Sequence, residues 1–217
     1  MNVSRSIWLP VGVALFLIGL RANGQLAAPG ALDSVSGCAH HTCTWVPFLV
    51  GKAFRKGDLS YKVEIGNETG GTFVLARGGR VLLRTPLEDL DASVSVVWSH
   101  DQKNFAITWS DGGEIGIFHV RAFHLDGDRA SELPAVNHAY EAFKARHWCE
   151  ERGDNIQAHS WLHESRDLLL VLSVYPTSDC GKEMGHTEAY VVEALTGQIR
   201  EHWDLKQLKA YMRSHPE

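Results

Sequence analysis

The sequence lacks an apolar segment long enough to favour a membrane span, which needs about 20 apolar residues. Its main apolar run, Ile7–Leu20, is shorter than that and follows the basic residue Arg5. This order is typical of a secretion signal. Small residues just before Gln25 fit signal-peptidase cleavage, so we expect residues 1–24 to be a signal peptide and no second segment to span a bilayer.

Catalytic signatures are missing as well. The sequence has no Gly-x-Ser-x-Gly elbow, Ser-x-x-Lys pair, His-Glu-x-x-His helix, phosphate-binding glycine loop or dinucleotide fingerprint. These absences favour a non-catalytic protein and imply no cofactor.

Basic residues are outnumbered, with 21 Lys and Arg against 26 Asp and Glu. Loss of residues 1–24 removes Arg5 and Arg21 but no acid, so the mature chain is more negative still. Such a charge argues against nucleic acid or anionic lipid as a partner. Contact with a membrane is expected only through the transient signal peptide, and the partner is expected to be a protein or a cell-wall component.

Cysteine is scarce, with four residues in the chain. Four cysteines in an exported protein are most simply two disulfides, for which three connectivities exist. Cys38 and Cys43 lie close enough in sequence to close a small loop, which leaves Cys149 to pair with Cys180. Disulfides favour a periplasmic or secreted location.

The mature chain, residues 25–217, is expected to be a single domain with an irregular lead-in at residues 25–37. Short apolar runs broken by Gly, Asn and Asp then predict antiparallel β structure, with a tight hairpin at Gly78–Gly79. The expected strands are Leu59–Ile65, Gly71–Ala76, Arg80–Arg84, Val94–Trp98, Phe105–Trp109 and Gly116–Leu125.

Helical spacing is present in two places only. Apolar residues between Leu133 and Trp148 recur at helical intervals, with Pro134 suited to a first turn. Near the C-terminus, Asp204 and Gln207 have the spacing of a capping box. We therefore expect a mainly β fold with one internal and one C-terminal helix.

Two segments share a pattern: Trp98–Ile107 aligns without a gap on Trp161–Leu170. In each, a strand ends in Trp, an acid and a base follow in a polar turn, and an apolar strand returns. The pattern resembles the inner hairpin of blades in TolB-type and WD-like β-propellers, although His100 and Gln102 replace a usual Pro and Gly. The resemblance implies propeller-like repeats, and a β-sandwich is the alternative.

The segment Cys38–Cys43 contains His40 and His41, which are potential copper or zinc ligands. In an oxidising compartment we expect a disulfide loop with exposed histidines instead. The loop also resembles the protruding loop of Ivy-type lysozyme inhibitors, in which His41 would match the family's histidine. That resemblance implies an inhibitor that presents the loop to an enzyme.

A second candidate metal cluster depends on the Cys149–Cys180 pairing. This disulfide would bring His147 and His186 near one another, together with Glu188 or Asp154, as a His/carboxylate set. The competing interpretation is a cross-linked polar surface region, which we favour from the sequence, so no tight transition-metal binding is expected. The leading hypothesis is a non-catalytic binding or scaffold module of the cell envelope. The alternatives are a metal-binding protein or metal-dependent enzyme, and a secreted enzyme inhibitor.

Overall fold

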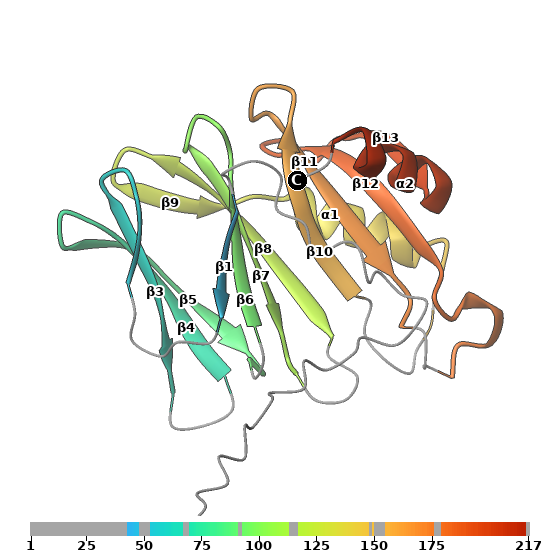
Figure 1. Cartoon of the computed structure of the whole chain (residues 1–217), viewed down its shortest axis with the longest axis horizontal. Helices are drawn as coiled ribbons and strands as arrows, with labels where there is room; N and C mark the ends of the chain where they lie inside the picture. The colour runs from blue at the N-terminus through green and yellow to red at the C-terminus, as the bar shows by residue number, and fades with distance from the viewer. Residues whose placement is uncertain are drawn as a thin grey trace, which may run out of the picture.

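The computed structural model describes residues 43–47, 53–66, 70–90, 93–112, 117–147, 149, 155–175 and 179–215. These residues form three antiparallel sheets, two α-helices and one short 3₁₀ helix, and no sheet closes into a barrel (Figure 1). The expectation of a mainly β fold with one internal and one C-terminal helix is confirmed.

Within each sheet, consecutive strands pair with one another, except that the first described strand joins the central sheet out of chain order. The N-terminal sheet contains β2 (Phe54–Lys56), β3 (Leu59–Ile65), β4 (Gly70–Arg77) and β5 (Arg80–Glu88). The central sheet contains β6 (Ser93–Trp98), β7 (Asn104–Ser110), β8 (Phe118–Asp126) and β9 (Arg129–Glu132), with β1 (Cys43–Pro47) paired antiparallel to β6. The C-terminal sheet contains β10 (Asn155–Leu162), β11 (Asp167–Ser173), β12 (Thr187–Glu193) and β13 (Ile199–Asp204).

The hairpin between β4 and β5 turns at Gly78 and Gly79, as the sequence predicts. Their φ angles are 55° and 85°, a region that side chains of L-residues rarely adopt. Arg77 pairs with Arg80 across this turn, so two residues suffice to reverse the chain.

The N-terminal and central sheets share an aromatic core. Phe73 of β4 packs on Phe105 of β7, and Tyr61 of β3 packs on Trp98 of β6, each pair with ring centroids 6.0 Å apart. All four side chains are at most 2% exposed. Burial of large aromatic area between two sheets is the main stabilising interaction at this interface.

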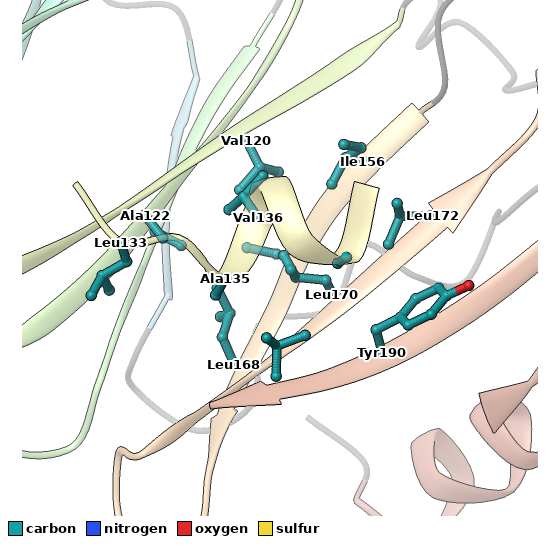
Figure 2. Close-up of a cluster of buried hydrophobic side chains, with 14 of the residues drawn as sticks. Val120, Ala122, Leu133, Ala135, Val136, Ile156, Leu168, Leu170, Leu172 and Tyr190 are labelled. Carbon is teal, nitrogen blue, oxygen red and sulfur yellow. The ribbon is translucent and has the colours of Figure 1, made fainter. Parts of the chain in front are cut away.

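The opposite face of the central sheet packs against the C-terminal sheet and α1 (Ala135–Lys144). Ala106 and Ala122 are fully buried on this face, and their small side chains leave room for the helix. Figure 2 shows α1 lying over the side chains that the C-terminal sheet presents, among them Leu168, Leu170 and Tyr190. The helix expected between Leu133 and Trp148 therefore lies in a core.

The second helix, α2 (Leu205–Ser214), covers the outer face of the C-terminal sheet, so the two helices lie on opposite sides of that sheet (Figure 1). Asp204 accepts a hydrogen bond from the Gln207 backbone, and the Gln207 side chain accepts one from the Asp204 backbone. This is the capping box that the sequence predicts. Leu208 is fully buried against the sheet and attaches the helix.

The two aligned segments form hairpins of the same register. Trp98 pairs with Phe105 across β6 and β7, and Trp161 pairs with Leu168 across β10 and β11. Trp98 is 1% exposed, whereas Trp161 is only partly buried, so the two aligned tryptophans do not pack equivalently. The indole N–H of Trp161 donates to the carbonyl of Val97 at 3.0 Å and joins the two sheets.

Cys149 and Cys180 form a disulfide, as expected from the sequence. Such a bond indicates a location outside the cytoplasm. Among the helices that the structure describes, none is long and apolar enough to cross a membrane. The expected signal peptide and the Cys38–Cys43 pairing fall on residues or side chains outside the described part of the chain.

Candidate metal centre

The start of β12 places three functional side chains on one face. His186 directly precedes the strand, and Glu188 and Tyr190 follow at alternate positions. Side chains two residues apart in a strand point to the same side. The Tyr190 hydroxyl donates to Oε2 of Glu188 at 2.8 Å, and Nε2 of His186 lies 3.3 Å from Oε1 of the same carboxylate.

His147 reaches this face from the C-terminal end of α1. Its backbone N–H donates to the carbonyl of Phe143 at 2.9 Å, which continues the helical turn, and its ring packs on the Phe143 ring. The disulfide two residues later ties the segment to Cys180. As a result, the His147 and His186 rings stack with centroids 3.8 Å apart.

A third histidine, His202, comes from the neighbouring strand. In the pairing of β12 with β13, His202 lies opposite Tyr190, and their ring centroids are 5.0 Å apart. Its Nε2 atom lies 2.9 Å from Oε2 of Glu188. Three imidazoles, from the turn after α1, the start of β12 and β13, therefore surround one carboxylate.

The Glu188 side chain is 5% exposed and uses its two oxygens differently. Oε2 accepts from Tyr190 and faces His202. Oε1 faces Nε2 of His147 at 3.1 Å and Nε2 of His186 at 3.3 Å. The half-exposed Arg146 guanidinium also lies 3.3 Å from Oε1. These contacts compensate the carboxylate, because a buried charge is costly unless it is paired and hydrogen-bonded.

The hydrogen bonds outweigh burial in setting the charge of Glu188. Burial alone would raise the pKa of this carboxyl, but hydrogen bonds from Tyr190, His186 and His147 and the nearby His202 lower the pKa to about 2. Burial, together with the same hydrogen bond to Glu188, raises the pKa of the Tyr190 hydroxyl. Glu188 is therefore a carboxylate, and Tyr190 a neutral donor, at neutral pH.

A second carboxylate fixes the orientation of His147. Nδ1 of His147 lies 2.9 Å from Oε2 of Glu183, which belongs to the 3₁₀ turn Gly181–Glu183. This hydrogen bond lowers the pKa of Glu183. When Nδ1 carries the proton and donates it to Glu183, Nε2 of the neutral ring presents a lone pair towards Glu188.

Nε2 of His147 and Oε1 of Glu188 lie 3.1 Å apart, so either a proton on Nε2, in the metal-free cluster, or a metal ion bound by both atoms joins them. His147 Nε2 is buried and makes no well-aligned hydrogen bond, and the same is true of His202 Nε2. The ligand atoms of His147, His186 and Glu188 all lie within 4.8 Å of one another. The arrangement is therefore able to hold a metal ion.

Two of the three separations between the ligand atoms are compatible with zinc. Ligand atoms bound about 2.0–2.2 Å from one tetrahedral Zn²⁺ lie roughly 3.3–3.5 Å apart. The two separations to Oε1, 3.1 Å and 3.3 Å, are close to that value. Three protein ligands, two histidines and one carboxylate, leave a fourth position open, which is the usual composition of a catalytic zinc site and differs from the closed four-ligand structural sites.

A cavity of about 460 Å³ opens beside the cluster and is lined by His186 and Glu188 themselves. The rest of its wall comes from the segment before β12 and the start of α2. Those residues are Lys182, Met184, Gly185, Thr187, Asp204, Leu205 and Lys206. Solvent and small molecules can therefore approach the open side of the cluster.

Of the candidate metal ligands in the sequence, the structure brings together His147, His186 and Glu188. His40, His41 and Asp154 lie outside the described residues. Sequence reasoning did not single out His202, Tyr190 or Glu183. The alternation of His186, Glu188 and Tyr190 was a usable signal, but the place of His202 depends on the β12–β13 register.

Comparisons of this chain with protein-family models, with curated proteins and with solved structures find no match. The function must therefore be argued from the site itself.

Proposed function

We propose that this chain is an exported metal-binding protein that holds one divalent transition-metal ion, best fitted by Zn²⁺, between His147, His186 and Glu188. The observation that carries the proposal is the approach of two imidazole Nε2 atoms to a single buried oxygen, Oε1 of Glu188, at 3.1 and 3.3 Å. Of the alternatives open at the level of sequence, the geometry favours metal binding over a polar surface region without a ligand.

The surrounding residues support this assignment. Metal-binding histidines commonly donate their second ring nitrogen to a carboxylate, and His147 does so to Glu183. Metal-binding carboxylates are in turn hydrogen-bonded, and Tyr190 and His202 engage the oxygen of Glu188 that faces away from the two ligand histidines. The ion would replace the protons that otherwise occupy the cluster.

The location and charge of the protein fit the same proposal. A disulfide next to the cluster matches an oxidising compartment such as the periplasm, where the thiols are not available as ligands. Imidazole and carboxylate ligands are then the donors that remain for zinc. The proposed ligand is therefore a divalent metal ion held by imidazole and carboxylate groups.

Isothermal titration of the oxidised, chelator-treated protein with Zn²⁺ tests the proposal. We expect one ion per chain in a site that survives dialysis. His186→Ala should weaken binding by more than the roughly 10- to 100-fold that loss of a supporting residue costs. The fold should persist in this variant because the side chain is 39% exposed.

The matched control is His100→Ala, which removes an exposed histidine in the turn after β6. It should leave the zinc affinity unchanged. Absence of bound zinc, or equal affinity in the wild type and His186→Ala, would contradict the proposal. The cluster would then be a metal-free hydrogen-bonded network that joins α1 to the C-terminal sheet.

A further inference from the structure

The cavity beside the cluster is large enough for a small molecule and borders two of the proposed metal ligands. It reaches the metal ligands His186 and Glu188, and its volume of about 460 Å³ lies in the range of small-molecule sites. The open coordination position of a His/His/Glu zinc site needs a water or a ligand atom. A molecule in this cavity would be able to supply that atom.

The net charge of the cavity favours binding of an anion once a divalent ion is bound beside it. The charged residues around the cavity are Lys182, Lys206, Glu188 and Asp204, whose formal charges cancel. The carboxylate of Asp204 is already engaged, because it caps α2 by accepting from the Gln207 backbone. A divalent ion between His147, His186 and Glu188 therefore gives the cavity a net positive charge, with two exposed lysines at its edge.

The cavity wall also has an apolar part. Met184 is 45% exposed and Leu205 is 37% exposed, and both line this cavity. Large exposed hydrophobic residues are few in the described part of the chain, and the others are Ile65, Val81 and Leu195. Two of them at one cavity mark a surface that can cover an apolar group.

We infer that the cavity binds a small carboxylate with an apolar substituent, whose carboxylate oxygen occupies the open coordination position and whose apolar part contacts Met184 and Leu205. The lysines Lys182 and Lys206 favour the anion electrostatically. This inference rests on the proposed metal site, since the metal supplies the charge and the bond to the carboxylate.

The test uses the full oxidised chain loaded with Co²⁺, whose visible absorption reports coordination changes at a zinc-type site. Three probes are compared: 3-methylbutanoate, acetate and 3-methylbutan-1-ol. We expect both carboxylates to change the Co²⁺ spectrum, and 3-methylbutanoate to bind about tenfold more tightly, the effect of burying roughly two methylene groups. The neutral alcohol should not change the spectrum.

Variants separate the two recognition elements. Lys182→Gln combined with Lys206→Gln should weaken both carboxylates several-fold, while Lys209→Gln, an exposed lysine of α2 outside the cavity, should not. Met184→Ser should remove the preference for 3-methylbutanoate over acetate. The control Leu195→Ser changes an exposed residue away from the cavity and should keep that preference.

The outcomes distinguish the two proposals. If the protein takes up no Co²⁺ or Zn²⁺, the metal-binding function and the carboxylate site are both wrong. If Co²⁺ binds but the carboxylates leave its spectrum unchanged, the metal site stands and the carboxylate site is wrong. If the alcohol competes as well as 3-methylbutanoate, or acetate binds equally tightly, recognition of an apolar carboxylate is also wrong.

Discussion

Nδ1 of His147 lies 2.9 Å from a carboxylate oxygen of Glu183, and this contact sets which ring nitrogen of His147 faces Glu188. The 3₁₀ turn that carries Glu183 starts next to Cys180, the partner of Cys149 in the disulfide. One covalent link thus holds both the histidine and the residue that orients it. Two predictions depend on this arrangement.

The first prediction concerns the orientation of His147. Glu183→Gln replaces the carboxylate by an amide of similar size, which weakens the preference for a proton on Nδ1. We expect zinc affinity to fall by roughly 10- to 100-fold, the usual cost of losing a supporting carboxylate. Titration with Zn²⁺ checks this. Glu141→Gln, at an exposed position of α1, is the control and should bind zinc like the wild type.

The second prediction concerns the disulfide. Cys149 and Cys180 are separated by 31 residues, and a loop of that length gives about 3–4 kcal/mol of stabilisation in the chain-entropy model. Cys149→Ser combined with Cys180→Ser should reduce the free energy of unfolding by that order, as measured with urea. Zinc affinity should fall in the same variant because His147 and Glu183 lose their common tether. Unchanged zinc affinity would mean that packing of α1 alone positions His147.

The third prediction is a dependence of stability on pH that originates at His159. This side chain is 7% exposed, and burial lowers its pKa below the ordinary value of 6.5 because the charged form is desolvated. The unfolded chain then binds the proton more tightly than the folded chain. The free energy of unfolding is therefore highest above pH 6.5. It falls as the pH drops from 6.5 to the lower pKa of His159 in the folded state, by at most about 1.4 kcal/mol per pH unit.

Urea unfolding at pH 7.5 and pH 5, with chelator present, measures this effect. His159→Gln removes the titrating group, so the stability difference between the two pH values should be smaller in the variant than in the wild type. The control is His100→Ala, whose exposed histidine should not change that difference. Equal pH dependence in all three proteins would show that burial of His159 does not affect its protonation.

Sequence rules predict the hairpin-rich half of the fold well. The alternation in Leu59–Ile65 gives β3 its observed bounds, and the two glycines at 78–79 give the β4–β5 turn. Strand β13 is not predicted by these rules. Its residues, Ile199–Asp204, are largely polar and partly exposed at the edge of the sheet, a composition typical of a loop. Strand β12 is buried on both faces, between α1 and α2, and shows no alternation.

The candidate site can be predicted only in part from the sequence, because long-range contacts place some of its residues. Proximity to the two bonded cysteines indicates His147 and His186, and local spacing adds Glu188. His202 and Glu183 are brought in by strand register and by a 3₁₀ turn, respectively, and neither has a local sequence signal. The position of Glu188 as an acceptor shared by several side chains depends on all of these elements, so it cannot be predicted from local sequence.

The turns of the two aligned hairpins also meet in a way that the alignment does not predict. The Asn104 side-chain amide donates to the carbonyl of Ser165 at 3.0 Å, and the Asp101 backbone N–H donates to the Ser165 hydroxyl at 3.2 Å. The Asp101 carboxylate also accepts from the Ser99 hydroxyl at 2.6 Å and from the Lys103 backbone at 3.1 Å. Asp101 is therefore part of a network, whereas Glu164 is simply exposed.

The fourth prediction follows from this difference between the two hairpins. Trp98→Ala removes a side chain that is 1% exposed and packs on Phe105 with ring centroids 4.7 Å apart, so it should cost about 3–5 kcal/mol of unfolding free energy. Trp161→Ala should cost less, because the side chain is only partly buried, but more than a surface change, because its hydrogen bond to Val97 is lost.

The two acids should differ in the same experiment. Asp101→Ala should cost about 1 kcal/mol through loss of its hydrogen bonds in the turn, and Glu164→Ala should stay within about half a kcal/mol. Urea unfolding of the four single variants measures these values. If Trp161→Ala behaves like Glu164→Ala, the indole does not help to hold the C-terminal sheet on the central sheet. The matching register of the two hairpins would then reflect similar turns without an equivalent role in packing.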